Sequence, residues 1–362
     1  MKKKLLSMML AVSMTALALT GCGAASEAES TIEELVAEET EESIVEETST
    51  EEIAEEETEA AVEADNTTMA MVGVLKGPTA IGTAFLNAWA DKALTDQEYV
   101  FTMETAADEL LPLIIKGEID IALVPANVAS VLYNKTEGGI SVIDINTLGV
   151  LYMVSGDQSI TGPADLAGKT VYLTGKGTTP DYVLHNILEA NGLSESDLTL
   201  EYKSEPTEVA AILAQNSDAV GLLPQPFVTV ACSKNASLSV VMDLTEQWDA
   251  VNKDSRLVTG VTVVRNQFLE EHPNAVKSFL ADHARSVDMV YEDTDMAAQL
   301  TAEFGIVDNE DVARKAIPQC NIVCIQGEEM KSALSGYLKA LYDQDPSSVG
   351  GNLPGEEFYY IQ

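Results

Sequence analysis

The chain has 362 residues, is 46% hydrophobic, and carries 59 acidic against 20 basic residues, a formal net charge of −39. A surface this acidic repels nucleic acid and anionic lipid headgroups, which excludes both as broad electrostatic partners. Only four cysteines and three histidines are present, too few for a dense disulfide scaffold or a run of metal-binding motifs.

The N-terminus predicts export. Lys2, Lys3 and Lys4 precede an apolar run at 5–19, as in a secretory signal, and Leu19-Thr20-Gly21-Cys22 looks like a bacterial lipobox. A short transmembrane anchor is the alternative, but the run is shorter than the roughly 20 residues that span a bilayer. We therefore expect residues 1–22 to be a lipoprotein signal peptide that ends at a lipidated Cys22. The mature protein would be extracytoplasmic, held at the bacterial cell membrane by its lipid anchor.

The segment after this signal is strongly acidic. Residues 26–65 contain 18 Asp plus Glu and no Lys or Arg. Sparse apolar positions such as Ile32, Leu35 and Ile53 allow an amphipathic helix, but like charges surround them. We favour a disordered acidic tether over 23–66, because such a segment repels itself and buries little apolar surface.

From residue 66 onward, predicted strands alternate with predicted helices, which indicates α/β units with largely parallel sheets. The predicted strands are 71–75, 98–103, 119–124, 148–154, 170–174, 198–202, 219–223, 238–242 and 257–264. We expect 148–154 to cross into a second lobe and 257–264 to return. The C-terminal helices, at 273–291, 294–304 and 328–342, would then pack on the first lobe. The predicted fold is two α/β domains joined by two crossing strands, lobe 1 being 67–154 plus 258–362 and lobe 2 being 155–257.

Two strand-to-helix junctions share a similar turn. Lys76-Gly77-Pro78-Thr79 follows the first strand. Gly175-Lys176-Gly177-Thr178 precedes a helix whose expected N-cap is Thr179. A separate helix start, with a capping box, is expected at Thr105–Asp108. Such junctions aim backbone N–H groups and the positive end of a helix dipole at one place. We predict two facing cradles for an anion or polar ligand. An ordinary loop that only caps a helix is the alternative for each.

Two more junctions should line the same cleft. Pro125-Ala126-Asn127 and Pro224-Gln225-Pro226 each follow a buried strand and open a helix. In α/β sheets, ligands bind at the carboxyl ends of such strands.

Cysteine usage leaves three possibilities for Cys320 and Cys324: a disulfide, part of a soft metal site, or two small buried residues. A metal needs further ligands, and His185, His272 and His283 do not cluster with this pair in the sequence. We expect no metal and no cofactor.

Two strings carry a resemblance to a known family: Lys-Gly-Glu-Ile-Asp-Ile-Ala at 116–122, followed by Pro125-Ala126-Asn127, and Asp-Leu-Ala-Gly-Lys-Thr-Val at 165–171, leading to Gly177-Thr178-Thr179. Over about residues 69–345 the chain resembles the extracytoplasmic solute-binding proteins of ABC importers in the nitrate/sulfonate/taurine group. These proteins share their fold with thiamine-precursor binders. The resemblance implies a two-lobed type II periplasmic binding protein, monomeric, which delivers a small-molecule ligand to a membrane permease with its ATPase.

The resemblance also implies which residues contact the ligand. They are Gly77, Pro78, Thr79, Asn127, Gly177, Thr178, Thr179, Gln225 and Pro226. Lys76 and Lys176 could add charge, and Tyr152 and Tyr182 could stack on a flat ligand. Because none of the four arginines falls in an expected cleft loop, a small strong anion is disfavoured. Sulfonate, nitrate, pyrimidine and other heteroaromatic ligands stay open.

Two other functions were weighed. A ligand-sensing lipoprotein on the same fold would have the same sequence features. A thiamine-precursor-type enzyme is less favoured, because the chain has no nucleophile–base constellation and no H-E-x-x-H motif. No catalytic residue is expected.

Overall fold

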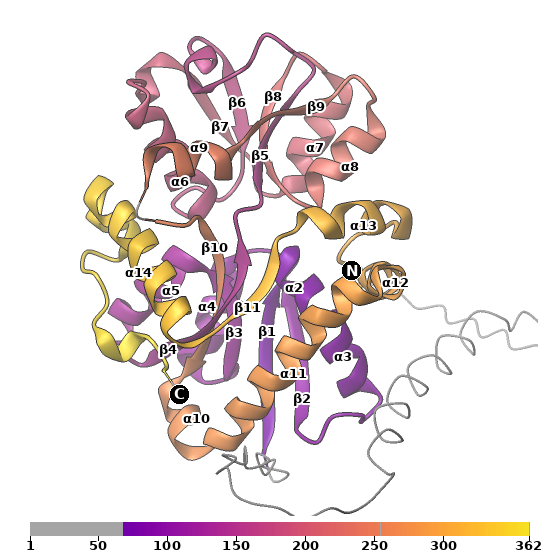
Figure 1. The fold of residues 1–362 in the computed structure, drawn as a ribbon, viewed down its shortest axis with the longest axis vertical. Helices are drawn as coiled ribbons and strands as arrows, with labels where there is room; N and C mark the ends of the chain where they lie inside the picture. Colours follow the sequence, from indigo (N-terminus) through magenta and orange to yellow (C-terminus); the bar gives the residue numbers. More distant parts are fainter. Residues whose placement is uncertain (1–67, 254, 362) are drawn as a thin grey trace, which may run out of the picture. The chain divides into compact units, whose positions relative to one another are not determined.

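The computed structural model describes residues 68–253 and 255–361, so the predicted signal peptide, Cys22 and most of the acidic tether lie outside it. The described part contains two sheets with helices packed on them (Figure 1). The strands are β1 Met69–Leu75, β2 Glu98–Glu104, β3 Ile121–Pro125, β4 Ile140–Leu148, β5 Leu151–Ser155, β6 Thr170–Leu173, β7 Thr199–Tyr202, β8 Val220–Pro224, β9 Ser239–Asp243, β10 Val258–Arg265 and β11 Ile322–Ile325. The α-helices are α2 Pro78–Gly82, α3 Ala84–Asp91, α4 Ala107–Lys116, α5 Ala126–Lys135, α6 Thr179–Ala190, α7 Pro206–Gln215, α8 Phe227–Lys234, α9 Leu244–Val251, α10 Asn266–Glu271, α11 Pro273–Glu292, α12 Thr294–Glu303, α13 Glu310–Ala316 and α14 Gly327–Gln344.

The first sheet has the strand order β11-β4-β10-β3-β1-β2. Its strands β2, β1 and β3 are parallel, whereas β10, β4 and β11 are joined to them by antiparallel pairs. Strand β3 is buried on both faces: Ala122 and Val124 belong to the core cluster with α4, α5 and α14, and Ile121 and Leu123 are buried on the opposite face. Burial on both faces explains the nearly continuous apolar sequence of this strand.

The second sheet repeats the plan with the order β7-β6-β8-β5-β9. Strands β7, β6 and β8 are parallel, and β5 pairs antiparallel with both β8 and β9. The expectation of largely parallel sheets is therefore wrong for the strands nearest the crossings, which run antiparallel in both sheets. Strand β10 enters the first sheet from the second, and β5 enters the second sheet from the first, so each runs opposite to its two neighbours.

The two crossings differ from the prediction in position. The strand expected at 148–154 is two strands, since β4 ends at Leu148 in the first sheet and β5 starts at Leu151 in the second. The first crossing is therefore Gly149-Val150, and lobe 2 starts a few residues before the expected 155. The return lies between the end of α9 at Val251 and the start of β10 at Val258.

Some elements were missed or misplaced by one or two residues. Strands β4 and β11 and helices α9 and α13 were not predicted as such. The α4 capping box does not use Thr105: the N-cap is Ala106, and the Glu109 carboxylate accepts the N–H groups of Ala106 and Thr105. The N-cap of α6 is Thr178, not Thr179, because helical geometry already starts at Thr179.

The C-terminal helices bridge the two lobes as well as covering the first. Helix α11 packs on α3 and β11, as expected, but α13 contacts α8 and α14 contacts α6 of the second lobe. A second contact with this lobe is made by Tyr337 of α14 and Trp248 of α9, both fully buried, whose ring centroids lie 5.3 Å apart. The expectation that the predicted C-terminal helices pack on the first lobe is confirmed for α11, α12 and α14, and α14 in addition reaches the second lobe.

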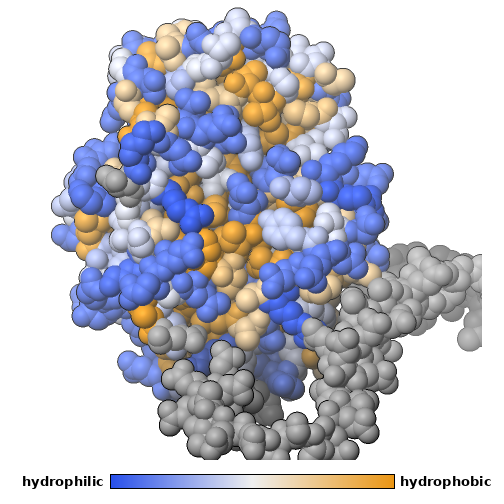
Figure 2. All heavy atoms as spheres, in the orientation of Figure 1, coloured by the Kyte–Doolittle hydropathy of each residue, from blue (hydrophilic) through white to orange (hydrophobic). Residues whose placement is uncertain are grey.

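The surface is mostly hydrophilic on the face that Figure 2 shows. On the face drawn in Figure 2, hydrophilic side chains cover most of the area and hydrophobic ones gather in smaller patches. Among the described helices, none is both long enough and apolar enough to cross a membrane.

Candidate functional site

A cleft of about 700 Å³ lies where the two sheets face each other. Both lobes and the first crossing contribute to its walls. The lining residues are Leu75, Lys76, Pro78, Thr79, Thr105, Ala106, Ala107, Asp108, Glu109, Pro125, Thr147, Val150, Leu151, Thr174, Gly175, Lys176, Thr178, Thr179, Pro180, Ser204, Glu205, Pro206, Pro224, Thr259 and Gly260. The volume is within the range of about 300–1,000 Å³ that is usual for small-molecule sites.

Threonine and proline dominate this lining. Seven threonines and five prolines face the cleft, and none of the lining residues is aromatic, arginine or histidine. Prolines give rigid apolar walls with no N–H to donate. The walls therefore offer hydroxyl groups and small apolar surfaces, and no ring on which a flat ligand could stack.

Several threonine hydroxyl protons are already used inside the protein. Thr79 Oγ1 donates to the Leu75 carbonyl at 2.6 Å, and Thr178 Oγ1 donates to the Gly175 carbonyl at 2.7 Å. Thr147 Oγ1 donates to Asn146 Oδ1 at 2.9 Å. A hydroxyl has one proton and two lone pairs, so each of these oxygens has only acceptor capacity left for a ligand.

Charged groups of both signs line the cleft. Lys76 and Lys176 come from the two matching turns, one in each lobe, and the Lys176 ammonium lies 5.2 Å from the centre of the Tyr202 ring. Asp108, Glu109 and Glu205 oppose them. The lining therefore has a slight excess of negative charge.

The second turn differs from the predicted anion cradle. The Gly177 N–H donates to Asp181 Oδ2 at 2.7 Å, so the protein's own carboxylate takes this donor. Asp181 also accepts the hydroxyl of Tyr202 at 2.6 Å and lies 3.0 Å from Nδ1 of His185. Burial by itself would raise the pKa of the Asp181 carboxyl, but the hydrogen bonds from His185, Gly177 and Tyr202 lower it below its usual range. A second negative group at this turn would meet an ionised carboxylate.

Four of the nine predicted contact residues line the cleft: Pro78, Thr79, Thr178 and Thr179. Gly77 and Gly177 belong to the same turns but are not among the lining residues. Both have positive φ, 140° and 72°, which explains glycine at these positions, since L side chains rarely adopt this conformation. Their role is to shape the turns that present the threonines.

Asn127 has a different position from the expected one. It is fully buried, and its Nδ2 donates to the Ser348 carbonyl at 3.1 Å and to the Gly177 carbonyl at 3.3 Å. Asn127 therefore joins the start of α5 in the first lobe to the turn before α6 in the second lobe. Its contacts are with the protein rather than with the cleft.

Gln225, Pro226 and the two candidate stacking tyrosines are also absent from the lining. Gln225 is buried, and its Oε1 accepts from the Thr229 hydroxyl at 2.9 Å. Tyr152 packs in the second-lobe core, and Tyr182 packs against the main core cluster. The neighbouring Pro224 lines the cleft in place of Pro226.

The cleft residues that follow β2 and β7 were not predicted as ligand contacts. Thr105 and Asp108 come after β2, and Ser204 and Glu205 come after β7. Both segments follow the carboxyl end of a parallel strand and open a helix, the same signal that was applied to other junctions. Thr259, near the start of β10, lines the cleft just after the return crossing.

Comparison with known proteins agrees with this architecture. Residues 139–297 match the family model described as NMT1/THI5 like. A Brucella abortus protein, named only as a candidate binding protein, is 23% identical over 220 residues, which cover 59% of this chain and 65% of that protein. The chain therefore spans less than two thirds of the length of the curated relatives it matches.

Solved structures with this fold include an ABC transporter protein from Parabacteroides distasonis, with a TM-score of 0.68 and 24% identity over 82% of this chain and 99% of that one. The periplasmic aliphatic sulphonate-binding protein SsuA of Escherichia coli has a TM-score of 0.63 and 15% identity over 81% of this chain and 96% of its own. The predicted two-lobed periplasmic-binding-protein fold and the resemblance to this group are confirmed.

Proposed function

We propose that this protein is a lipid-anchored, extracytoplasmic solute-binding protein that captures a small molecule between its two lobes and delivers it to an ABC permease and its ATPase. The observation that supports this most directly is the shared cleft: Thr79 and Thr178, from matching turns of opposite lobes, line one cavity. The relatives support a solute-binding component of an import system at the level of the fold and family match.

The anchor and the acidic tether belong to this proposal and depend on the sequence alone. Cys22 follows an apolar run and a lipobox-like end, and two acyl signals are what stable membrane attachment requires. Metabolic labelling with a fatty-acid analogue tests the anchor. Label that persists in Cys22→Ala contradicts it.

The polar groups of the cleft limit the classes of ligand that it can bind. Three of its seven threonine hydroxyls, those of Thr79, Thr147 and Thr178, have only acceptor capacity left, its three carboxylates add more acceptors, and its lining contains no ring for stacking. We propose a small, non-aromatic ligand that carries N–H or O–H donors, such as an amine or a polyol. A sulfonate or nitrate would bring acceptors to acceptors and would meet only the two lysines as charged donors.

A thermal-shift screen of amines, amino acids, polyols, sulfonates, nitrate and pyrimidines tests this proposal, because a ligand that binds only the folded state raises the melting temperature. We expect the donor-bearing, non-aromatic compounds to raise it most. Stabilisation by sulfonates or pyrimidines alone would contradict the ligand class but not the cleft.

Two valine variants test the cleft itself. Thr79→Val and Thr178→Val each remove one acceptor oxygen. Each should weaken binding by roughly 10-fold, because losing one hydrogen bond costs up to about 1.4 kcal/mol and that energy corresponds to a 10-fold change in affinity. Thr136→Val is the matched control, because the Thr136 hydroxyl donates to the Leu132 carbonyl at 2.8 Å in the same way but lies outside the cleft lining. Equal affinities for the cleft and control variants would place the ligand elsewhere.

A further inference from the structure

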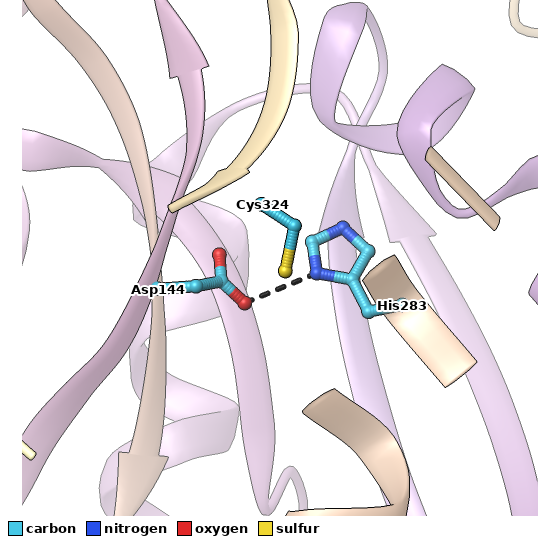
Figure 3. A group of neighbouring side chains, drawn as sticks. All are labelled: Asp144, His283 and Cys324. Atoms are coloured by element: carbon cyan, nitrogen blue, oxygen red, sulfur yellow. Dashed lines mark hydrogen bonds and ion pairs between the residues drawn. The ribbon is translucent and has the colours of Figure 1, made fainter. Parts of the chain in front are cut away.

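A second polar cluster lies in the first lobe, away from the cleft lining. Asp144 of β4, His283 of α11 and Cys324 of β11 bring a carboxylate oxygen, an imidazole nitrogen and a thiol sulfur within 4.8 Å of one another (Figure 3). Asp144 and His283 are fully buried and Cys324 is partly buried. The three residues are at least 41 positions apart in the chain, so no sequence motif contains them.

The side chains of this cluster point at a common centre. Asp144 Oδ2 lies 3.0 Å from His283 Nδ1, and Figure 3 shows the Cys324 sulfur directed at the same side of the ring. The other ring nitrogen, Nε2, has no hydrogen-bond partner among the described residues. All polar contacts of the imidazole are thus made where the carboxylate and the thiol meet it.

Neighbouring groups hold the carboxylate in place. The Thr262 hydroxyl donates to Asp144 Oδ1 at 2.7 Å, and Asn146 Nδ2 donates to the same hydroxyl at 3.2 Å. These hydrogen bonds use Asp144 Oδ1, so the other carboxylate oxygen, Oδ2, faces His283. Outer hydrogen bonds of this kind fix ligand orientation in metal sites.

The donor set matches a borderline-soft divalent cation. Thiolate, imidazole and carboxylate are the ligands of zinc sites, and bonds of about 2.0–2.3 Å put the ligand atoms about 3–4 Å apart. With Asp144 and Cys324 ionised and His283 neutral, the ligands carry two negative charges that balance the charge of the cation. The thiol proton, and any proton on His283 Nδ1, would leave to solvent on binding.

We propose that Asp144, His283 and Cys324, none of which lines the solute cleft, form a binding site for one divalent zinc-type ion. A solvent molecule on the side of the partly exposed Cys324 would complete the coordination, and the same side gives the ion its entry path. The ion would tie α11 to β4 and β11, the two strands at the edge of the first sheet.

Zinc alone is the probe. The purified full-length protein, stripped with a chelator, is titrated with Zn²⁺ in competition with a chromogenic chelator, so that weak binding by the many surface carboxylates does not register. We expect one tight site per chain. Thr262→Val, which removes the outer hydrogen bond, should weaken that site by roughly 10–100-fold, and Cys324→Ser should weaken it more.

Cys232→Ser is the control for Cys324→Ser, since Cys232 is a partly buried free cysteine of the second lobe outside the cluster. His283→Gln is also informative if it folds. His283 is fully buried, so a second measurement that does not depend on the folding of this variant is needed. Cd²⁺ added to the unaltered protein should give a thiolate-to-cadmium absorption band that Cys324→Ser abolishes and Cys232→Ser retains.

The proposal is overturned if the protein holds no zinc against the competing chelator. It is equally overturned if Cys324→Ser and Cys232→Ser bind zinc alike, or if cadmium gives no thiolate band. In those cases the cluster is a buried Asp144–His283 ion pair with a neighbouring thiol.

Discussion

A single carboxylate organises the turn beside the cleft. Asp181 accepts the Gly177 N–H and the Tyr202 hydroxyl, and it pairs with His185 one helical turn further on. The hydrogen bond with Asp181 raises the pKa of His185 to about 9, against the lowering effect of burial. The turn that presents Thr178 is therefore stabilised by an ion pair rather than by a bound anion.

This pair makes a prediction about pH. The unfolded pKa of histidine is about 6.5. A raised folded pKa gives stability that is fully present below the unfolded value and is lost as the pH rises through about 9. His185→Gln should therefore lower the free energy of unfolding by about 2 kcal/mol at pH 6. This figure converts somewhat more than half of the pKa shift of His185 at about 1.36 kcal/mol per pH unit. The loss should nearly vanish at pH 10.

Urea unfolding at the two pH values measures this difference. Glu195→Gln is the control, because the Glu195 side chain is 72% exposed and its contact with His185 Nε2 should contribute little. A loss in His185→Gln that is the same at pH 6 and pH 10 would show that the imidazole acts by packing and not by its charge.

At the scale of elements, the first crossing and the strand ends next to both crossings line the cleft. Val150 of the first crossing belongs to the lining, and so do strand residues next to the crossings: Thr147 and Leu151 beside the first, and Thr259 and Gly260 beside the second. The first crossing is only two residues long, so it has little freedom to adjust. Its Gly149 packs against Thr245 at the start of α9.

Gly149→Ala tests this close approach. An added Cβ would lie 2.1 Å from Thr245 Oγ1 and 3.0 Å from Thr245 Cβ, so one of the two elements must shift. We expect the free energy of unfolding to fall by about 1–3 kcal/mol, as in other overpacked sites. Equilibrium urea unfolding measures the loss.

The double variant Gly149→Ala/Thr245→Ala should recover most of that loss. Thr245→Ala alone should cost little, because its buried hydroxyl has no hydrogen-bond partner among the described residues. If the double variant is no more stable than Gly149→Ala, the two residues are not coupled and the clash does not govern this crossing.

At the scale of the whole folded part, the two lobes are joined by more than their crossings. The ring contact between Trp248 and Tyr337 and the hydrogen bonds of Asn127 both span the lobes. Movement about the crossings must keep or break these contacts. We therefore expect ligand binding to shift the population toward a closed state by a limited rotation.

Small-angle scattering measures this movement. With a saturating compound from the thermal-shift screen, the radius of gyration should decrease, because the ligand contacts both lobes at once only in the closed state. Thr178→Val at the same concentration of compound is the control and should change less. Unchanged dimensions at full saturation would reject closure as the binding mechanism.

The sequence alone determined the order of most elements and the place of the cleft. Apolar runs bounded by glycine and proline mark strands such as β3 and β8. The two similar turns, at 76–79 and 176–179, mark junctions that line a shared cavity. These signals are local, because backbone preferences and hydrophobic periodicity act over a few residues. Local signals also set the limits: β4 was missed although glycines flank it, because Asp144, Asn146 and Thr147 interrupt its apolar run, and β11 was missed because it has only four residues.

Only the tertiary structure decided what each polar group does. Gly177 offers an N–H in the sequence, but Asp181, held by His185 and Tyr202, takes it. Asn127 follows a cleft strand, yet the C-terminal segment and the opposite lobe use its amide. His283 and Cys324 are far apart in the chain and meet because α11 and β11 pack together. A hydrogen bond depends on which donor and acceptor arrive at one point, and residues distant in sequence supply most of those partners.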